Sequence, residues 1–128
     1  MKIKRKLIGI LLVLCMAATI LTTGSFAEEV NGIWTDYAAS SFEGGSGTKD
    51  DPYKIASAEQ LALLASDVNS GIGSKTHTRD YFVLASDIDL SGHRWIPIGF
   101  QFSASRNYRV FAGYFDGNGK KITGLYVD

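Results

Sequence analysis

The sequence predicts a mainly β fold in which short strands meet at sharp corners, preceded by one α-helix. Two apolar runs, Val110 to Phe115 and Ile122 to Val127, flank the segment Asp116-Gly117-Asn118-Gly119. Glycine after aspartate or asparagine marks a tight turn between strands. The second run breaks the two-residue period of a flat strand, because Ile122 and Leu125 are three residues apart. An amphipathic, capped helix is expected before these strands.

The turn has a clear backbone origin. Tight turns need positive φ, which glycine adopts freely and which asparagine and aspartate tolerate better than most residues. Phe111, Gly113 and Phe115 share one strand face, where Gly113 leaves room for a neighbouring backbone. Gly124 is expected to bend the second strand. A bend within so short a strand suits a solenoid better than a flat sheet.

The segment F-A-G-Y-F-D-G-N-G-K-K-I-T-G-L, Phe111 to Leu125, resembles the GLUG-motif repeat of bacterial secreted and cell-surface proteins. Two earlier blocks, Gly45 to Ile55 and Leu84 to Gly99, resemble segments that commonly precede this repeat. The resemblance implies the start of a right-handed parallel β-helix, a pectin-lyase-like solenoid in a surface setting, and it implies no reaction. The residues of the structural motif are Phe111, Gly113, Phe115, Asp116, Gly117, Asn118, Gly119, Ile122, Gly124 and Leu125.

The predicted helix begins at Ser57 and ends near Gly71. Gln60 follows Ser57 by three residues, which is the spacing of a capping box. One helical face carries the apolar residues Leu61, Leu64, Ala65 and Val68. We expect this helix to cover the open end of the solenoid, since an uncapped stack exposes strand edges and apolar side chains. A partner-binding helix is the alternative.

Residues 1–27 have the layout of a secretory signal peptide. A basic start precedes the apolar run from Leu7 to Leu21 and the small-residue pattern Ser25-Phe26-Ala27. We expect cleavage between Ala27 and Glu28, so that the chain meets a membrane only before cleavage.

Two other interpretations of this start, a membrane anchor and a lipoprotein, fit the residues less well. The apolar run is shorter than the roughly 20 residues that an uncleaved membrane anchor needs. A lipoprotein would carry a small residue before the modified cysteine, whereas Leu14 precedes Cys15.

Cleavage changes the composition of the chain. The four basic residues of the signal peptide would leave with it, so that nine basic residues would face 13 acidic ones and no basic stripe would remain for nucleic acid. Cys15 is the single cysteine, so the mature chain would have neither a disulfide nor a thiol nucleophile. Residues 28–47 are expected to be a leader or linker. Residues 48–128 are expected to hold the capping helix and the first layers of a repeat domain that is incomplete at its C-terminus.

No catalytic, cofactor-binding or metal-binding residues are predicted. The segment from Asp87 to Gly92 has the alternating oxygens of a calcium loop, but its twelfth position is Ile98 instead of glutamate. Strand alternation explains the same pattern, with Ile88 and Leu90 inward and the acids outward. The histidines, His77 and His93, lack the spacing of a zinc helix.

The expected function is therefore that of a non-catalytic secreted or cell-surface module, adhesin-like or scaffolding. Its ligand would be a carbohydrate or a component of the host or the cell wall. Candidate residues for a sugar-binding surface are Arg94, Trp95, Tyr108 and Tyr114, although such aromatics more often complete a core. The alternatives are the N-terminal fragment of a polysaccharide-active β-helix enzyme and a carbohydrate-binding module.

Overall fold

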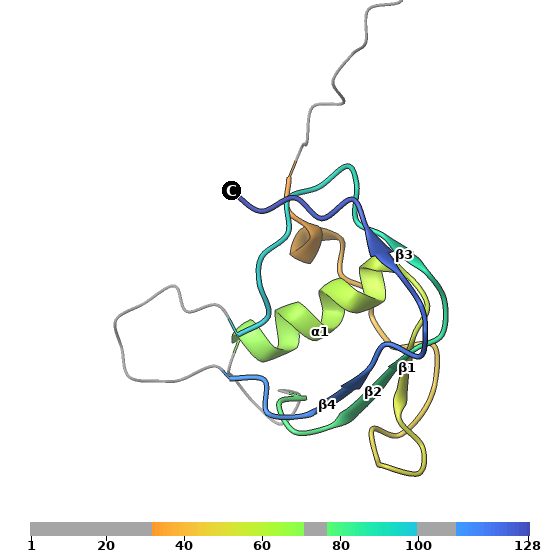
Figure 1. Ribbon diagram of the computed structural model, residues 1–128. Coiled ribbons are helices and arrows are strands. Elements are labelled where there is room, and N and C mark those ends of the chain that lie inside the picture. Colours follow the sequence, from red (N-terminus) through yellow and green to blue (C-terminus); the bar gives the residue numbers. More distant parts are fainter. Residues whose placement is uncertain (1–31, 71–76, 100–109) are drawn as a thin grey trace, which may run out of the picture.

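A computed structural model of the chain describes residues 32–70, 77–99 and 110–128 (Figure 1). The predicted signal peptide, with its cleavage point between Ala27 and Glu28, lies outside the described residues, as does Tyr108.

The described residues contain two helices and five short strands, and every strand pairing is parallel. A three-stranded sheet has the order β1-β2-β4, and β3 pairs with β5 in a two-stranded sheet. In chain order the elements are the 3-10 helix η1 (Trp34–Tyr37), β1 (Tyr53–Ile55), α1 (Ala58–Ser70), β2 (Tyr81–Leu84), β3 (Ile88–Asp89), β4 (Tyr114–Asp116) and β5 (Ile122–Thr123).

The predicted start of a right-handed parallel β-helix is wrong. The described residues form two small parallel sheets of short strands and one α-helix, with no solenoid and no closed sheet. The reason lies after β1, where the chain enters α1 and contributes no strand to the second sheet. Figure 1 shows α1 inside the curve of the strands and their connections, so helix side chains fill space that strand layers would otherwise have to fill.

Helix α1 forms because its N-terminus is capped and one of its faces is apolar. The Gln60 amide donates to Ser57 Oγ at 3.3 Å, and the Ala56 amide donates to Gln60 Oε1 at 2.7 Å. These bonds satisfy amide groups that the first helical turn leaves without partners. The predicted apolar face is confirmed, because Leu61, Leu64, Ala65 and Val68 are all buried.

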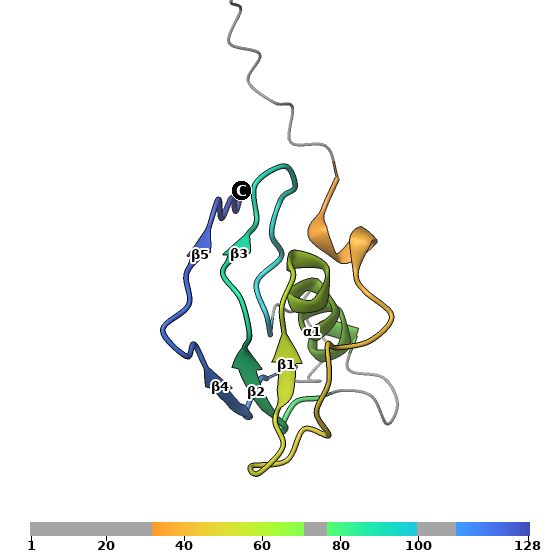
Figure 2. The ribbon, with the colours of Figure 1, turned by 90° about the vertical axis from the view of Figure 1, so that its right-hand side faces the viewer.

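The strands complete the core from the other side. Along β2, Phe82 and Leu84 are buried and the residues between them are only partly so, as a strand with one inward face requires. Ile88 and Leu90 are also buried, which confirms the predicted alternation in that segment. Figure 2 shows the row β4, β2, β1 with α1 beside β1, and β5 beside β3.

The predicted corner at residues 116–119 is present. Asn118 and Gly119 have φ of 47° and 66°, and the Lys120 amide donates to the Gly117 carbonyl at 2.8 Å. The Asn118 side-chain amide also donates to the Leu84 carbonyl at 3.1 Å, which ties the turn to the neighbouring segment. Because β4 and β5 belong to different sheets, this turn is a corner and not a hairpin.

Two glycines allow backbones to approach closely. A Cβ atom on Gly113 would lie 2.3 Å from the Asp80 carbonyl oxygen, and one on Gly124 would lie 2.5 Å from the Ser91 amide nitrogen. Gly124 also has φ of +68° and follows the end of β5, where the bend was predicted.

Residues 32–47, for which a leader or linker was predicted, pack against the rest of the fold. Trp34 is buried, and its Nε1 donates to the Leu90 carbonyl at 2.8 Å. The Glu43 amide donates to the Lys54 carbonyl at 3.0 Å, and the Lys54 amide donates to the Gly44 carbonyl at 2.9 Å. This segment therefore contributes to the core and covers one edge of β1.

Candidate functional site

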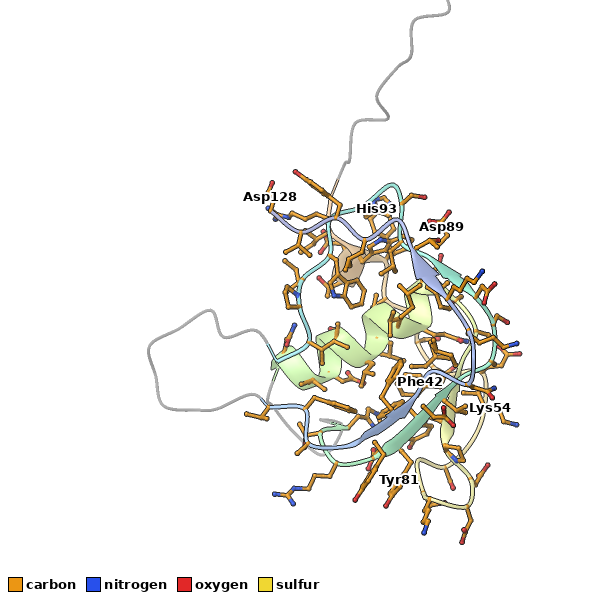
Figure 3. The ribbon with its side chains drawn as sticks, in the orientation of Figure 1. Phe42, Lys54, Tyr81, Asp89, His93 and Asp128 are labelled. Carbon is orange, nitrogen blue, oxygen red and sulfur yellow. The ribbon has the colours of Figure 1, made fainter. Side chains whose placement is uncertain are left out.

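Two tyrosines stack on the outward face of the three-stranded sheet. Tyr81 and Tyr114 pair across β2 and β4, with ring centroids 4.3 Å apart and an interplanar angle of 7°. Figure 3 shows the Tyr81 side chain directed away from the helix side of the sheet. Tyr114 is 62% exposed, so the stack holds a large aromatic surface in contact with solvent.

The stacked rings form one wall of an open groove of about 370 Å³. The loop before β1 supplies the other wall, and the groove carries both an ammonium and a carboxylate group. Its outward-facing lining consists of Lys49, Pro52, Tyr81, Val83, Tyr114 and Asp116.

The Tyr81 hydroxyl remains a hydrogen-bond donor at neutral pH. Desolvation raises its pKa above the ordinary value, and the neighbouring Tyr114 raises it further through charge repulsion and a side-chain hydrogen bond. The groove therefore combines apolar ring surface with a neutral hydroxyl, and these groups suit a ligand that is itself part apolar and part hydroxylated.

A second hollow, of about 530 Å³, lies near the C-terminal end of α1 and includes His77 in its lining. The histidine Nδ1 is 2.7 Å from Asp80 Oδ2, and its Nε2 is 3.5 Å from Asp67 Oδ2. Because both ring nitrogens face carboxylates, neither is directed at a substrate as a general base would be. This cluster joins the end of the helix to the approach to β2, and we assign it a structural role.

The aspartates that suggested a calcium loop bind backbone amides. Asp87 Oδ1 accepts from the Lys121 amide at 2.9 Å, and Asp89 Oδ1 accepts from the Ser91 amide at 2.9 Å. At the corner, Asp116 Oδ1 accepts from the Asn118 amide at 2.8 Å. Within the described ranges, no group of three or more histidine, cysteine or acidic side chains could hold a metal ion.

The lowered pKa of Asp89 predicts how the stability of the fold changes at acid pH. Hydrogen bonds from the Ser91 backbone and side chain lower its pKa below the ordinary value of 3.8. Its stabilising contribution is thus present above that value and is lost as the pH falls through the lower, folded-state pKa. We expect Asp89→Asn, which cannot ionise, to differ most from the parent near neutral pH and least at about pH 2. Urea unfolding at both pH values measures this, and an equal difference at both would contradict it.

Of the residues predicted to line a sugar-binding surface, the three that the structure describes do not come together. Trp95 is buried, Arg94 Nη1 lies 3.5 Å from Asp128 Oδ1, and only Tyr114 lines the groove. Its actual partner, Tyr81, was missed. The available signal was that each tyrosine belongs to an apolar run and is followed directly by a phenylalanine.

No family model matches the chain, and no solved structure matches it. Among curated proteins, it is 36% identical over 96 residues to a protein of Evansella cellulosilytica (strain ATCC 21833) named "Putative Gly-rich membrane protein". The match covers 70% of this chain and 10% of the relative, so the chain spans about a tenth of the length of the curated relative that it matches. The resemblance to the GLUG-motif repeat stays a prediction.

The name of this relative bears on location. A membrane protein is compatible with a place at the cell surface. In the part of this chain that the structure describes, every helix is too short or too polar to cross a membrane.

Proposed function

We propose that the chain is a non-catalytic, adhesin-like module of a secreted or cell-surface protein, and that it binds carbohydrate along the Tyr81–Tyr114 groove. The observation that carries this proposal is the parallel stack of Tyr81 on the exposed Tyr114, beside Lys49 and Asp116. Export through a signal peptide cleaved between Ala27 and Glu28, and membership of the GLUG-motif proteins, are parts of the same proposal.

The chemistry of the groove supports a sugar as the ligand. A sugar ring has an apolar C–H face, which packs on an aromatic ring, and hydroxyl groups around its edge, which need polar partners. The stack supplies the ring surface, and Lys49 and Asp116 supply a donor and an acceptor. Because the stack holds Tyr114 in place before a ligand arrives, little side-chain entropy is lost on binding.

We expect the purified chain to be retarded in native gels that contain a soluble polysaccharide. The probes are xylan, polygalacturonate, hydroxyethyl cellulose and enzymatically solubilised peptidoglycan. Tyr114→Ala should weaken the binding of the retarding polymer about tenfold, which corresponds to about 1.4 kcal/mol. Titration calorimetry with the same polymer measures the change.

Tyr126→Ala is the matched control, because Tyr126 is another exposed tyrosine, at 44%, and does not line the groove. It should leave binding unchanged. Failure of the parent chain to bind any of the four polymers, or equal losses in the two variants, would rule out the groove as a carbohydrate site.

A further inference from the structure

Exposed apolar side chains concentrate at one end of the molecule. Phe115 is 38% exposed, although its neighbour in the next strand, Phe82, is 1% exposed. Ile122 is likewise 42% exposed, whereas its strand neighbour Ile88 is 1% exposed. Phe115 and Ile122 thus lie on the inward face, each next to a buried residue of the neighbouring strand, but are themselves exposed.

The same end presents unpaired strand edges. Among the described residues, β4 has only β2 as a neighbouring strand and β5 has only β3. Figure 2 shows β4 and β5 on one side of the molecule, with α1 and η1 on the opposite side. Such an edge beside exposed apolar side chains is a template for pairing with another strand.

The opposite end is closed. The outer edge of β1 is covered by backbone bonds to Glu43 and Gly44, and α1 lies beside it. Copies of the chain therefore cannot stack head to tail without limit. An interface in which the same patch meets itself closes as a two-fold dimer and forms no filament.

We propose that the β4–β5 end binds a second copy of this chain across a two-fold axis through the corner at residues 117–119. This axis places β4 of one copy antiparallel to β5 of the other and keeps both inward faces on the same side. In one register, Phe115 lies opposite Ile122 of the second copy. The interface then buries both exposed apolar rows.

The charges of the paired side chains support this register. With Phe115 opposite Ile122, the next outward pair is Asp116 opposite Lys121 of the second copy, and the symmetry makes this pair twice. Opposite charges that face each other across antiparallel strands stabilise their pairing, and like charges destabilise it. Tyr114 would lie beside the small side chain of Thr123, so the interface places no bulky side chain next to the tyrosine stack, while Asp116 would line both the groove and the interface.

The test uses the full chain, expressed with residues 1–27 in a secreting host and purified. Light scattering coupled to size-exclusion chromatography should give twice the monomer mass at micromolar concentration. Ile122→Lys should give the monomer with an unchanged far-ultraviolet circular dichroism spectrum, since Ile122 is exposed in a single copy. Lys54→Glu, an exposed change on β1 at the closed end, is the control and should leave the dimer intact.

Charge reversal then tests the register. Asp116→Lys and Lys121→Glu should each weaken the dimer at least tenfold, and the double variant should restore it. A monomeric parent chain, an open-ended assembly, or a dimer that persists in Ile122→Lys would overturn the proposal. If the double variant does not form the dimer, this register is excluded. None of these measurements involves carbohydrate, so they stand apart from the proposed function.

Discussion

Replacement of Phe82 by alanine should lower the free energy of unfolding by about 3 to 5 kcal/mol. Phe82 is among the largest fully buried side chains, and its ring lies within 5.5 Å, between centroids, of both Phe42 and Tyr53. Truncation removes apolar contacts and leaves a cavity between the sheet and the segment before β1. Guanidinium unfolding followed by circular dichroism, at one fixed protein concentration, measures the loss.

Val83→Ala provides the matched control. Val83 is next along β2, points to the opposite face and is only partly buried. Its truncation should cost about 1 kcal/mol or less. Similar losses for the two variants would mean that β2 has no preferred inward face, contrary to the alternation of its burial.

Replacement of Gly113 by valine should release β4 from β2 and cost about 3 kcal/mol, at the upper end of the range for overpacking. The first added carbon would lie 2.3 Å from the Asp80 carbonyl oxygen. That same oxygen accepts the Tyr114 amide at 3.0 Å, so the strand cannot move away from the clash without losing this hydrogen bond. Hydrogen exchange at the Tyr114 amide should therefore accelerate together with the loss of stability.

Gly117→Ala is the control for this change. A Cβ atom at Gly117 meets nothing within 4 Å, and its φ lies outside the left-handed region. We expect no loss and a gain of up to about 0.5 kcal/mol, because alanine restricts the unfolded chain. Equal destabilisation at both glycines would show that backbone freedom, and not the contact with Asp80, explains the effect at Gly113.

Local features of the fold could be predicted from the sequence, because neighbouring residues determine them. The sequence predicts a helix from a cap at Ser57 to near Gly71, and α1 spans Ala58–Ser70. The turn at Asn118-Gly119 follows from a short pattern in the same way. Each of these features depends only on a local property of the sequence, namely a hydrophobic period, a helix cap or a preference for positive φ.

The arrangement of these elements could not be predicted, because it depends on contacts between distant residues. Nothing in the local pattern around Trp34 shows that its indole donates to Leu90, and a segment rich in alanine, serine and glycine predicts a linker. The register that stacks Tyr114 on Tyr81 is likewise set by pairing across a long connection. The solenoid was wrong for the same reason, since helix α1 was expected to cover the end of a stack of strands but packs inside their curve.

The parallel pairing of all five strands has a consequence for how the chain folds. Tyr53 pairs with Phe82, and Phe82 pairs with Phe115, so each pairing closes a loop of about thirty residues. Closing such a loop costs about 3 kcal/mol of chain entropy, apart from a constant, before the strands gain any contacts. Helix α1 pays no such cost, and it lies between β1 and β2 in the sequence, where its formation shortens the distance that the chain must search. Because β1, β2 and β4 lie side by side in chain order, each strand of this sheet has its neighbour already synthesised when it emerges.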